Sequence, residues 1–286
     1  MKSPRLPLNG WVVLDKPLGL SSTQALGKVR WLLNADKAGH GGTLDPLASG
    51  VLPIAFGEAT KTVSWAMNGR KTYRFQVKWG AETSTDDLEG EITRQSDHIA
   101  MQHDIEAILL QFIGTVHQIP PAYSAIKVAG ERAYDLARAG EAVELASRLV
   151  NIESLQIESH GPAGETTFIV HCGKGTYVRS LARDMGRVLG CLGHVTLLRR
   201  LRVGPFTEAE AISLEMLEEL RHRPPSENSL AHILRPIETV LDGIPALAVM
   251  DPEAQRLKQG QRVPLIEVGS SLQEAEAVLE IGRAHV

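Results

Sequence analysis

The chain has 286 residues, 43% of them hydrophobic, and a formal net charge of −4. This length and composition fit one large globular domain, or one domain with a small additional unit. No apolar run approaches the ~20 residues of a membrane span, and the N-terminal segment lacks the apolar region of a signal peptide.

In the first half of the chain, hydrophobic periodicity predicts two strands and two helices. Trp11–Asp15 fits a short buried strand, and Ser22 is placed to cap the helix that follows it. The alternation of apolar and polar residues over Tyr73–Trp79 predicts a half-buried strand. A helix fits Ile105–Phe112, because Gly114 follows as a stop signal.

In the second half, the pattern predicts further strands and helices without a regular βαβ order. One helix carries Arg179, Arg183 and Arg187 at helical spacing, a pattern typical of a solvated helix face. We therefore favour an α+β fold over a doubly wound one. The predicted helices cover 133–139, 178–189, 214–220 and 253–257; the predicted strands cover 150–157, 166–171 and 194–203; a linker covers 221–229, and 244–249 begins a small C-terminal unit.

The residues that hold metals, disulfides or nucleotide cofactors do not occur in the patterns that those groups need. Cys172 and Cys191 are separated by eighteen residues and form no CxxC pair. The ten histidines show no HExxH spacing, and no GxxxxGK[ST] or GxGxxG motif follows a predicted strand. We therefore expect no metal and no cofactor, and the cysteine usage is typical of the reducing cytoplasm.

Positive charge is concentrated in two segments. Residues 1–80 contain 11 Lys or Arg against 4 acidic residues, and residues 171–204 contain 7 against Asp184 alone. Two basic blocks in an acidic protein suggest one positive face that binds nucleic acid. Two ordinary solvated faces explain the same counts, and composition does not decide between these explanations.

The segment Gly39–Pro53, GHGGTLDPLASGVLP, holds a single acid, Asp45, between a glycine-rich turn and Pro46. Glycines allow close approach of another backbone, and proline fixes the chain after the acid. A lone acid on so constrained a loop is a candidate reactive group. By local composition alone, a solvated aspartate in a Gly/Pro turn is the simpler explanation.

Several segments together resemble the TruB family of tRNA pseudouridine-55 synthases. They occur in the family's order over about residues 10–206, which makes the resemblance highly specific. They read GWVVLDKPLGLSS (10–22), AGHGGTLDPLASGVLPIAFGEATK (38–61), KTYRF (71–75), the DxxG motif DLEG (87–90), QIPPAYSAIKVAGERAYDLARAG (118–140), GKGTYVRSLARDMG (173–186) and HVTLLRRLRVGPF (194–206).

The resemblance implies an isomerase that converts uridine-55 in the T loop of tRNA to pseudouridine. The uracil is cut from the ribose at N1, turned, and rejoined through C5, and the target base must be flipped out of the RNA. This reaction needs no redox step, so the resemblance also implies no cofactor. The partner is the tRNA T arm; we expect a monomer without an obligatory protein partner or a membrane.

The resemblance also implies roles for individual residues. Asp45 matches the catalytic aspartate and Arg179 an arginine that pairs with the aspartate. Tyr73 matches a tyrosine that can stack on the uracil or take a proton from it. The substrate-binding positions are Lys16, His40, Tyr177 and Leu198. The expected RNA contacts are Tyr123, Lys127 and Arg132, in an RNA-gripping insertion at about 103–150.

For the architecture, the resemblance implies a mixed, largely antiparallel central sheet flanked by helices. Residues 1–240 form the catalytic domain, and 241–286 form a small, mostly β unit resembling a PUA domain, which looks abbreviated.

Two other functions fit parts of the sequence. One is an RNA-folding helper whose chemistry is lost or secondary, although intact Asp45, Tyr73 and Arg179 argue against lost chemistry. The other is a glycoside-type hydrolase, which normally needs a second carboxylate close to the first. The nearest acids in sequence are Asp36 and Glu58, so the sequence disfavours this reading. Which carbon Asp45 attacks, C1′ of the ribose or C6 of the uracil, also stays open.

Overall fold

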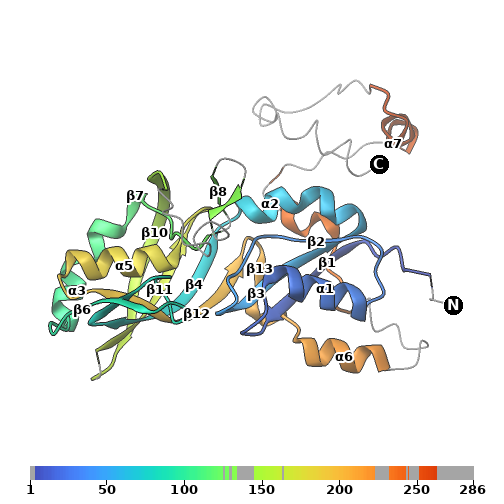
Figure 1. The fold of residues 1–286 in the computed structure, drawn as a ribbon. Helices are drawn as coiled ribbons and strands as arrows, with labels where there is room; N and C mark the ends of the chain where they lie inside the picture. The colour runs from blue at the N-terminus through green and yellow to red at the C-terminus, as the bar shows by residue number, and fades with distance from the viewer. Residues whose placement is uncertain are drawn as a thin grey trace.

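The structure of the protein is a computed structural model, whose fold is shown in Figure 1. The described residues are 4–124, 126–128, 131–133, 145–162, 164–222, 232–242, 244 and 251–262.

Within these residues, nine strands form one mixed sheet in which most neighbours are antiparallel. The order along the sheet is β1-β3-β12-β4-β11-β10-β7, with β2 paired to β3 and β13 paired to β12. Only the β12–β3 pair of this sheet is parallel. The strands are β1 (Gly10–Lys16), β2 (Ala38–His40), β3 (Ala48–Phe56), β4 (Lys71–Trp79), β7 (Gly114–Gln118), β10 (Arg148–His160), β11 (Glu165–Cys172), β12 (Gly193–Val203) and β13 (Phe206–Thr207). The predicted α+β fold with a largely antiparallel sheet is confirmed.

Two small hairpins and a set of helices complete the described fold. The hairpins pair β5 (Ala81–Thr83) with β6 (Ile92–Gln95) and β8 (Lys127–Val128) with β9 (Glu131–Arg132). The α-helices are α1 (Ser22–Leu32), α2 (Val63–Asn68), α3 (Gln102–Ile108), α5 (Val178–Val188), α6 (Leu214–His222) and α7 (Asp251–Lys258); the 3-10 turns are η1 (Gly57–Thr62), η2 (Leu109–Phe112), η3 (Glu208–Glu210) and η4 (Ile237–Leu241).

The core lies on both faces of the sheet around β1 and β3, because alternate side chains of a strand point to opposite faces. Val12 and Leu14 belong to a large cluster that extends from α1 to α5, while Trp11 and Val13 belong to a smaller cluster with residues of η1 and α2. Figure 1 shows α5 lying along the β4, β10 and β11 end of the sheet and α1 at the β1 end.

The predicted alternation in β4 is confirmed. Phe75, Val77 and Trp79 are buried, and Phe75 stacks on Phe168 of β11 with ring centroids 5.1 Å apart. Arg74 points to the other face and forms an ion pair with Glu158 at 2.7 Å. The sheet therefore has one apolar face here and one charged face.

Most predicted elements are observed, but some details differ. The N-cap of α1 is Ser21, not Ser22: the Ser21 hydroxyl accepts from the Gln24 N–H in a capping box. The predicted helix at 105–112 ends at Ile108 and continues as the 3-10 turn η2. The predicted helix at 133–139 and the element at 244–249 lie almost entirely outside the described residues.

Candidate active site

Asp45 lies in the loop between β2 and β3, and α5 brings Arg179 to it. The Arg179 Nε lies 2.9 Å from the Asp45 Oδ2. The Arg179 side chain is 5% exposed, whereas that of Asp45 is 36% exposed. The contact is an ion pair whose N–H is not aligned for a hydrogen bond. A carboxylate that is open to solvent on one side and held by a buried cation on the other is suited to meet an external substrate.

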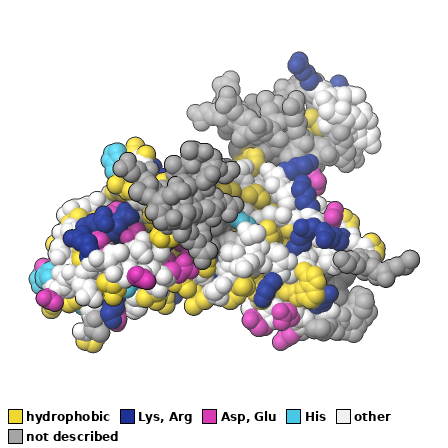
Figure 2. All heavy atoms as spheres, in the orientation of Figure 1, with side chains coloured by type: hydrophobic (Ala, Val, Ile, Leu, Met, Phe, Trp, Pro, Cys, Tyr) yellow, Lys and Arg dark blue, Asp and Glu magenta, His cyan; other side chains and the backbone are white. Residues whose placement is uncertain are grey.

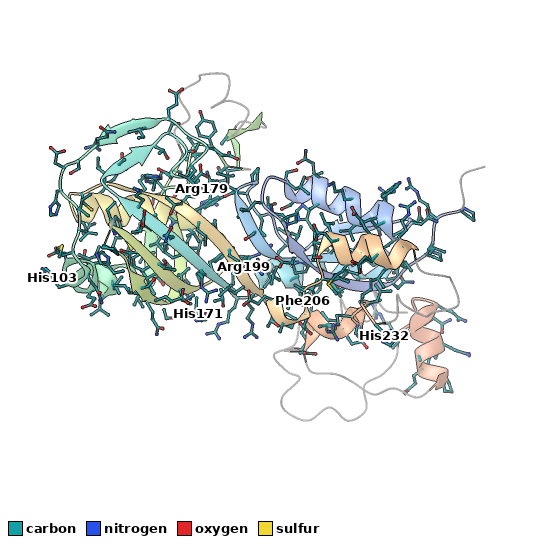
Figure 3. All side chains as sticks on the ribbon, turned by 90° about the horizontal axis from the view of Figure 1, so that it is seen from below. His103, His171, Arg179, Arg199, Phe206 and His232 are labelled. Carbon is teal, nitrogen blue, oxygen red and sulfur yellow. The ribbon has the colours of Figure 1, made fainter. Side chains whose placement is uncertain are left out.

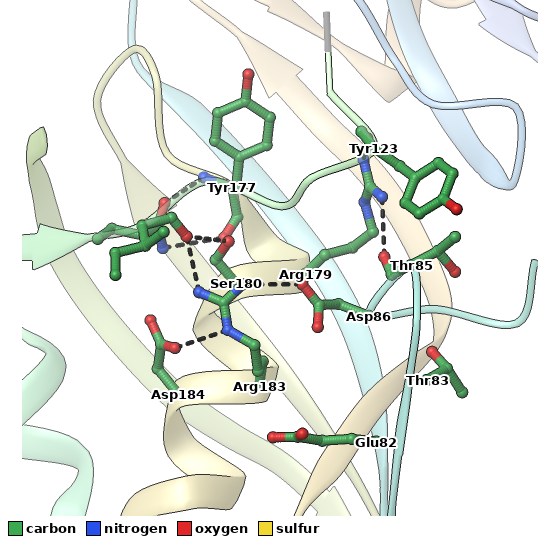
Figure 4. Close-up of polar contacts among 12 residues, drawn as sticks. Glu82, Thr83, Thr85, Asp86, Tyr123, Tyr177, Arg179, Ser180, Arg183 and Asp184 are labelled. Carbon is green, nitrogen blue, oxygen red and sulfur yellow. Dashed lines mark hydrogen bonds and ion pairs between the residues drawn. The ribbon is translucent and has the colours of Figure 1, made fainter. Parts of the chain in front are cut away.

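The rest of the Arg179 guanidinium is also occupied (Figure 4). Its Nη1 donates to the Thr85 carbonyl and its Nη2 to the Tyr123 carbonyl, each at 3.0 Å. The Nη1 also lies 3.5 Å from the Asp87 Oδ2. These contacts fix the direction in which the Nε faces Asp45. Figure 3 shows Arg179 near the middle of the elongated molecule.

Asp87 is a second carboxylate at the site, which the sequence analysis missed. Its side chain is 7% exposed, and it accepts from the Thr85 hydroxyl and from the Glu89 N–H. The acids nearest to Asp45 in sequence, Asp36 and Glu58, gave no sign of this carboxylate. Asp87 reaches the site through the turn after β5.

The expected solvated stripe of arginines on α5 is wrong for Arg179 and Arg183, which are buried in ion pairs, whereas the Arg187 side chain is 52% exposed. Arg183 contacts Asp86 at 3.0 Å and its side chain is 9% exposed, while Arg187 contacts Glu82 at 2.6 Å. Burial raises the pKa of Asp86 to about 6, although the neighbouring Arg183 opposes this shift. Asp86 also has a positive φ of 61°, which is uncommon for a residue other than glycine. The residue that pairs with Arg183 beside the site therefore has an unusual backbone conformation.

Tyr73 lies on β4 directly opposite Arg200 of β12. Burial raises the pKa of Tyr73, while its interaction with Arg200 acts in the opposite direction. The phenol therefore stays protonated at neutral pH. Arg200 is buried and was not singled out in the sequence, where it is one of several arginines in the β12 segment.

Lys16 lies beneath the Asp45 loop, not in the cleft. It is completely buried, and its Nζ donates to the carbonyls of Leu20 at 2.6 Å and Pro17 at 2.9 Å, with the Pro46 carbonyl at 3.5 Å. Burial lowers the pKa of Lys16 to about 8, and nearby Asp45 counteracts part of that shift. Lys16 thus binds the backbone of the turn that follows it and lies close to the backbone of the loop that carries Asp45.

The other predicted substrate-binding residues lie around the site at different depths. His40 ends β2, and burial lowers its pKa. Tyr177 is the N-cap of α5, and its backbone N–H and carbonyl both bond to the Gln118 side chain. Leu198 is 8% exposed and lines the cleft beside Asp45.

The cleft beside Asp45 is small. Its volume is about 20 Å³, room for about one water molecule. Leu88, on its rim, is 58% exposed. The lining residues are Asp45, Leu47, Ala48, Asp87, Leu88, Arg179, Val195, Thr196, Leu197 and Leu198. Tyr73, Tyr177, His40 and Lys16 do not line it.

The residues expected to contact RNA follow β7. Tyr123 provides its carbonyl to Arg179. Lys127 and Arg132 are register partners across the β8–β9 hairpin, and their side chains are outside the described part. Within the segment 103–150, β7 joins the main sheet as its edge strand next to β10.

The basic residues do not form one continuous patch on the face drawn in Figure 2. Lys and Arg side chains gather there in several separate groups with acidic side chains between them. Among the described residues, no group of three or more His, Cys, Asp or Glu is arranged to hold a metal ion. In the same part of the chain, no helix is long and apolar enough to cross a membrane.

Comparison with known proteins gives consistent matches over most of the chain. Residues 30–178 match the family model for the N-terminal domain of TruB family pseudouridylate synthases, and residues 179–242 match that for the C-terminal domain of tRNA pseudouridylate synthase B. A protein of Rhodopseudomonas palustris named tRNA pseudouridine synthase B is 56% identical over 259 residues, covering 90% of this chain and 71% of that protein. A protein of the same name from Brucella anthropi is 50% identical over 286 aligned residues, covering 95% and 88%.

Among solved structures, a chain in the crystal structure of a Cbf5–Nop10–Gar1 complex has a TM-score of 0.70 and 27% identity, covering 88% of this chain and 67% of that chain. A chain in an H/ACA RNP bound to a substrate RNA has a TM-score of 0.69 and 25% identity. The fold and these relatives define an enzyme of the pseudouridine synthase class, an isomerase. Within that class, the chain belongs to the TruB family of pseudouridylate synthases.

Proposed function

We propose that this enzyme converts uridine-55 in the T loop of tRNA to pseudouridine. The relatives named tRNA pseudouridine synthase B support tRNA as the substrate. The single observation that carries the chemistry is the 2.9 Å contact between Arg179 and the half-exposed Asp45 beside a cleft. The reaction breaks the bond between N1 and the ribose C1′ and forms one between C5 and C1′, and N1 gains a proton while C5 loses one.

In this proposal, Asp45 starts the reaction as a carboxylate. It attacks C1′ of the ribose or C6 of the uracil, or it assists elimination at the sugar. The Arg179 guanidinium pairs with the carboxylate and aims it. Tyr73 stacks on the uracil; its raised pKa supports stacking over proton abstraction, because a protonated phenol is a poor base.

The target base must leave the RNA stack to reach Asp45, and flipping costs a few kcal/mol. The volume of the cleft, about 20 Å³, implies that the site opens as the base enters. The exposed Leu88 on the rim is the side chain best placed to move. In the proposal, Leu198 and Tyr177 wall the base, His40 contacts the extruded nucleotide, and Lys16 supports the loop from below.

Phosphate contacts need exposed cations, and we look first for those that are not paired with an acidic side chain. In the second basic block, Arg179, Arg183, Arg187 and Arg199 form ion pairs. Arg200 is buried, which leaves Lys174 and Arg202 as exposed cations of this block. We propose that they act with Tyr123, Lys127 and Arg132 in the RNA-gripping segment 103–150.

The remaining parts of the proposal concern the whole protein. Residues 1–240 act as the catalytic domain and 241–286 as a PUA-like unit, which lies largely outside the described residues. The enzyme works as a monomer in the cytoplasm and needs no cofactor, since the isomerisation has no redox step.

The test compares the parent protein with Asp45→Asn and Asp45→Ala on unmodified tRNA and on a T-arm stem-loop. Pseudouridine is mapped by carbodiimide modification and primer extension. We expect product at position 55 from the parent and none from either variant. Turnover by a variant contradicts the role of Asp45, and a parent without product contradicts the proposed function. Release of free uracil would indicate a hydrolase, for which Asp87 supplies a nearby second carboxylate.

A tRNA refolding assay separates the helper function from the chemistry. If refolding is unchanged in Asp45→Ala while pseudouridine is lost, the two activities coexist. If the parent refolds tRNA but modifies none, the helper function alone is correct.

A further inference from the structure

Arg200 is a buried arginine that binds backbone instead of a carboxylate. It is 1% exposed, and no described Asp or Glu lies within ion-pair distance of it. Its Nε donates to the Val51 carbonyl at 2.8 Å, its Nη1 to Thr43 at 3.1 Å and its Nη2 to Gly42 at 3.1 Å. A charge is expensive to bury, so a buried guanidinium without a carboxylate partner calls for a functional explanation.

Two of the three carbonyls belong to the loop that carries Asp45. The loop carbonyls from Gly42 to Pro46 all have donors, and different elements supply them. Arg200 takes the first two; the Ser22 hydroxyl takes the third, at 3.0 Å, and also accepts from the Leu44 N–H at 2.7 Å. The Ala48 N–H bonds the Asp45 carbonyl at 3.0 Å, and the Gly19 N–H bonds that of Pro46 at 2.9 Å. Each of these backbone carbonyls around the reactive acid is therefore hydrogen-bonded, and any movement of the loop would break some of these bonds.

Arg200 also contacts the second residue expected in the chemistry. It sits on β12 between Tyr73 on β4 and Gly50 on β3, and its guanidinium interacts with the Tyr73 hydroxyl. Close packing requires glycine at position 50, where an added Cβ would lie 2.2 Å from the Arg200 carbonyl. One side chain thus ties the Asp45 loop to the tyrosine strand.

We propose that Arg200 is a positioning residue for the isomerisation, which fixes the Asp45 loop and the Tyr73 hydroxyl relative to each other. The proposal rests on the proposed function above. Arginine suits this task because its rigid fork of five N–H donors reaches several acceptors at once, whereas lysine offers one compact group. Arg200 does not line the cleft, so it acts through the two residues that it holds.

The test uses Arg200→Met and Arg200→Lys, with Arg199→Met as a matched control. Arg199 is next on the same strand but points away from the loop, and it forms ion pairs with Asp15 at 2.9 Å and Glu208 at 3.2 Å. Each variant is checked for folding by circular dichroism, and kcat and KM are measured on a T-arm stem-loop. Misplacing reacting groups by about 1 Å can cost about 10²-fold in rate.

We expect kcat of folded Arg200→Met to fall about 10²-fold, with KM little changed. Arg200→Lys should recover part of kcat, because it keeps the charge and at least one carbonyl contact. Arg199→Met should keep the parent kcat. A parent-like kcat in Arg200→Met, or an equal loss in Arg199→Met, overturns the proposal.

Two remaining outcomes are also decisive. If Arg200→Met does not fold, Arg200→Lys decides: a folded Lys variant with parent kcat contradicts the proposal, and one with reduced kcat and unchanged KM supports it. A parent enzyme that makes no pseudouridine overturns the proposed function itself, and this inference with it; an active parent with unaffected Arg200 variants overturns this inference alone.

Discussion

Arg179 contacts two carboxylates that differ in their exposure to solvent. This difference predicts how the stability of the protein changes when the guanidinium is removed. Asp87 is 7% exposed, whereas Asp45 is 36% exposed. In Arg179→Met, solvent can stabilise the Asp45 charge, but the Asp87 charge is left buried with two hydrogen bonds. Breaking a buried ion pair by removing one partner costs about 3–5 kcal/mol.

The carbonyls of Thr85 and Tyr123 lose a donor in the same variant, at about 1 kcal/mol each. The free energy of unfolding of Arg179→Met should therefore fall by about 5–7 kcal/mol. Asp87→Asn removes the buried charge, so adding it to Arg179→Met should restore about 2 kcal/mol, although the same change destabilises the parent.

The measurement is a double-mutant cycle by urea unfolding, followed through the four tryptophans. A matched control is Arg94→Met, since Arg94 is 64% exposed and 3.7 Å from Glu82; it should cost less than about 1 kcal/mol. If Asp87→Asn has the same effect in both backgrounds to within about 0.5 kcal/mol, Arg179 and Asp87 are not coupled and the reasoning is refuted.

Three more changes test other parts of the site. The pKa of Asp86 in the folded protein, about 6, exceeds its ordinary value of 3.8, so ionisation of Asp86 opposes folding. As the pH rises from 4 to 7, the free energy of unfolding of Asp86→Asn relative to that of the parent should therefore increase by up to about 3 kcal/mol. A difference in urea unfolding that stays constant across that range contradicts this. Gly50→Ala places a Cβ 2.2 Å from the Arg200 carbonyl at a φ of +100°; calorimetry should show a loss above about 3 kcal/mol, and a parent-like melting temperature argues against the packing described. Ser22→Ala leaves the Leu44 N–H and carbonyl without their partner; it should cost about 1–3 kcal/mol in urea unfolding and lower kcat with KM unchanged, so an unaffected kcat would show that the loop keeps its position without the hydroxyl.

The pattern of the sequence was enough to predict most regular elements. The alternation over Tyr73–Trp79 needs only the two-residue period of a strand, and the helix that carries Arg179 needs only its apolar stripe and Gly190 as a stop. These features depend on neighbours a few residues apart, and such neighbours can be read along the chain.

The charged residues of the site could not be interpreted in this way. The helical spacing of Arg183 and Arg187 is the same whether the face meets water or acids, and only the packing of α5 against the β5 segment decides between them. Asp87 is 42 residues from Asp45 along the chain, whereas in the fold both carboxylates contact Arg179.

Most strands and helices, the family resemblance and the unusual loop around Asp45 could therefore be predicted from the order of the residues. Which side chains are buried, and what they bind, depends on the folded arrangement. Ser22 bonds to Leu44 instead of capping its helix, and Arg200 donates to the carbonyls of Gly42 and Thr43. The physical reason is that periodicity is a local property, while the burial of a polar group depends on partners that only folding brings together.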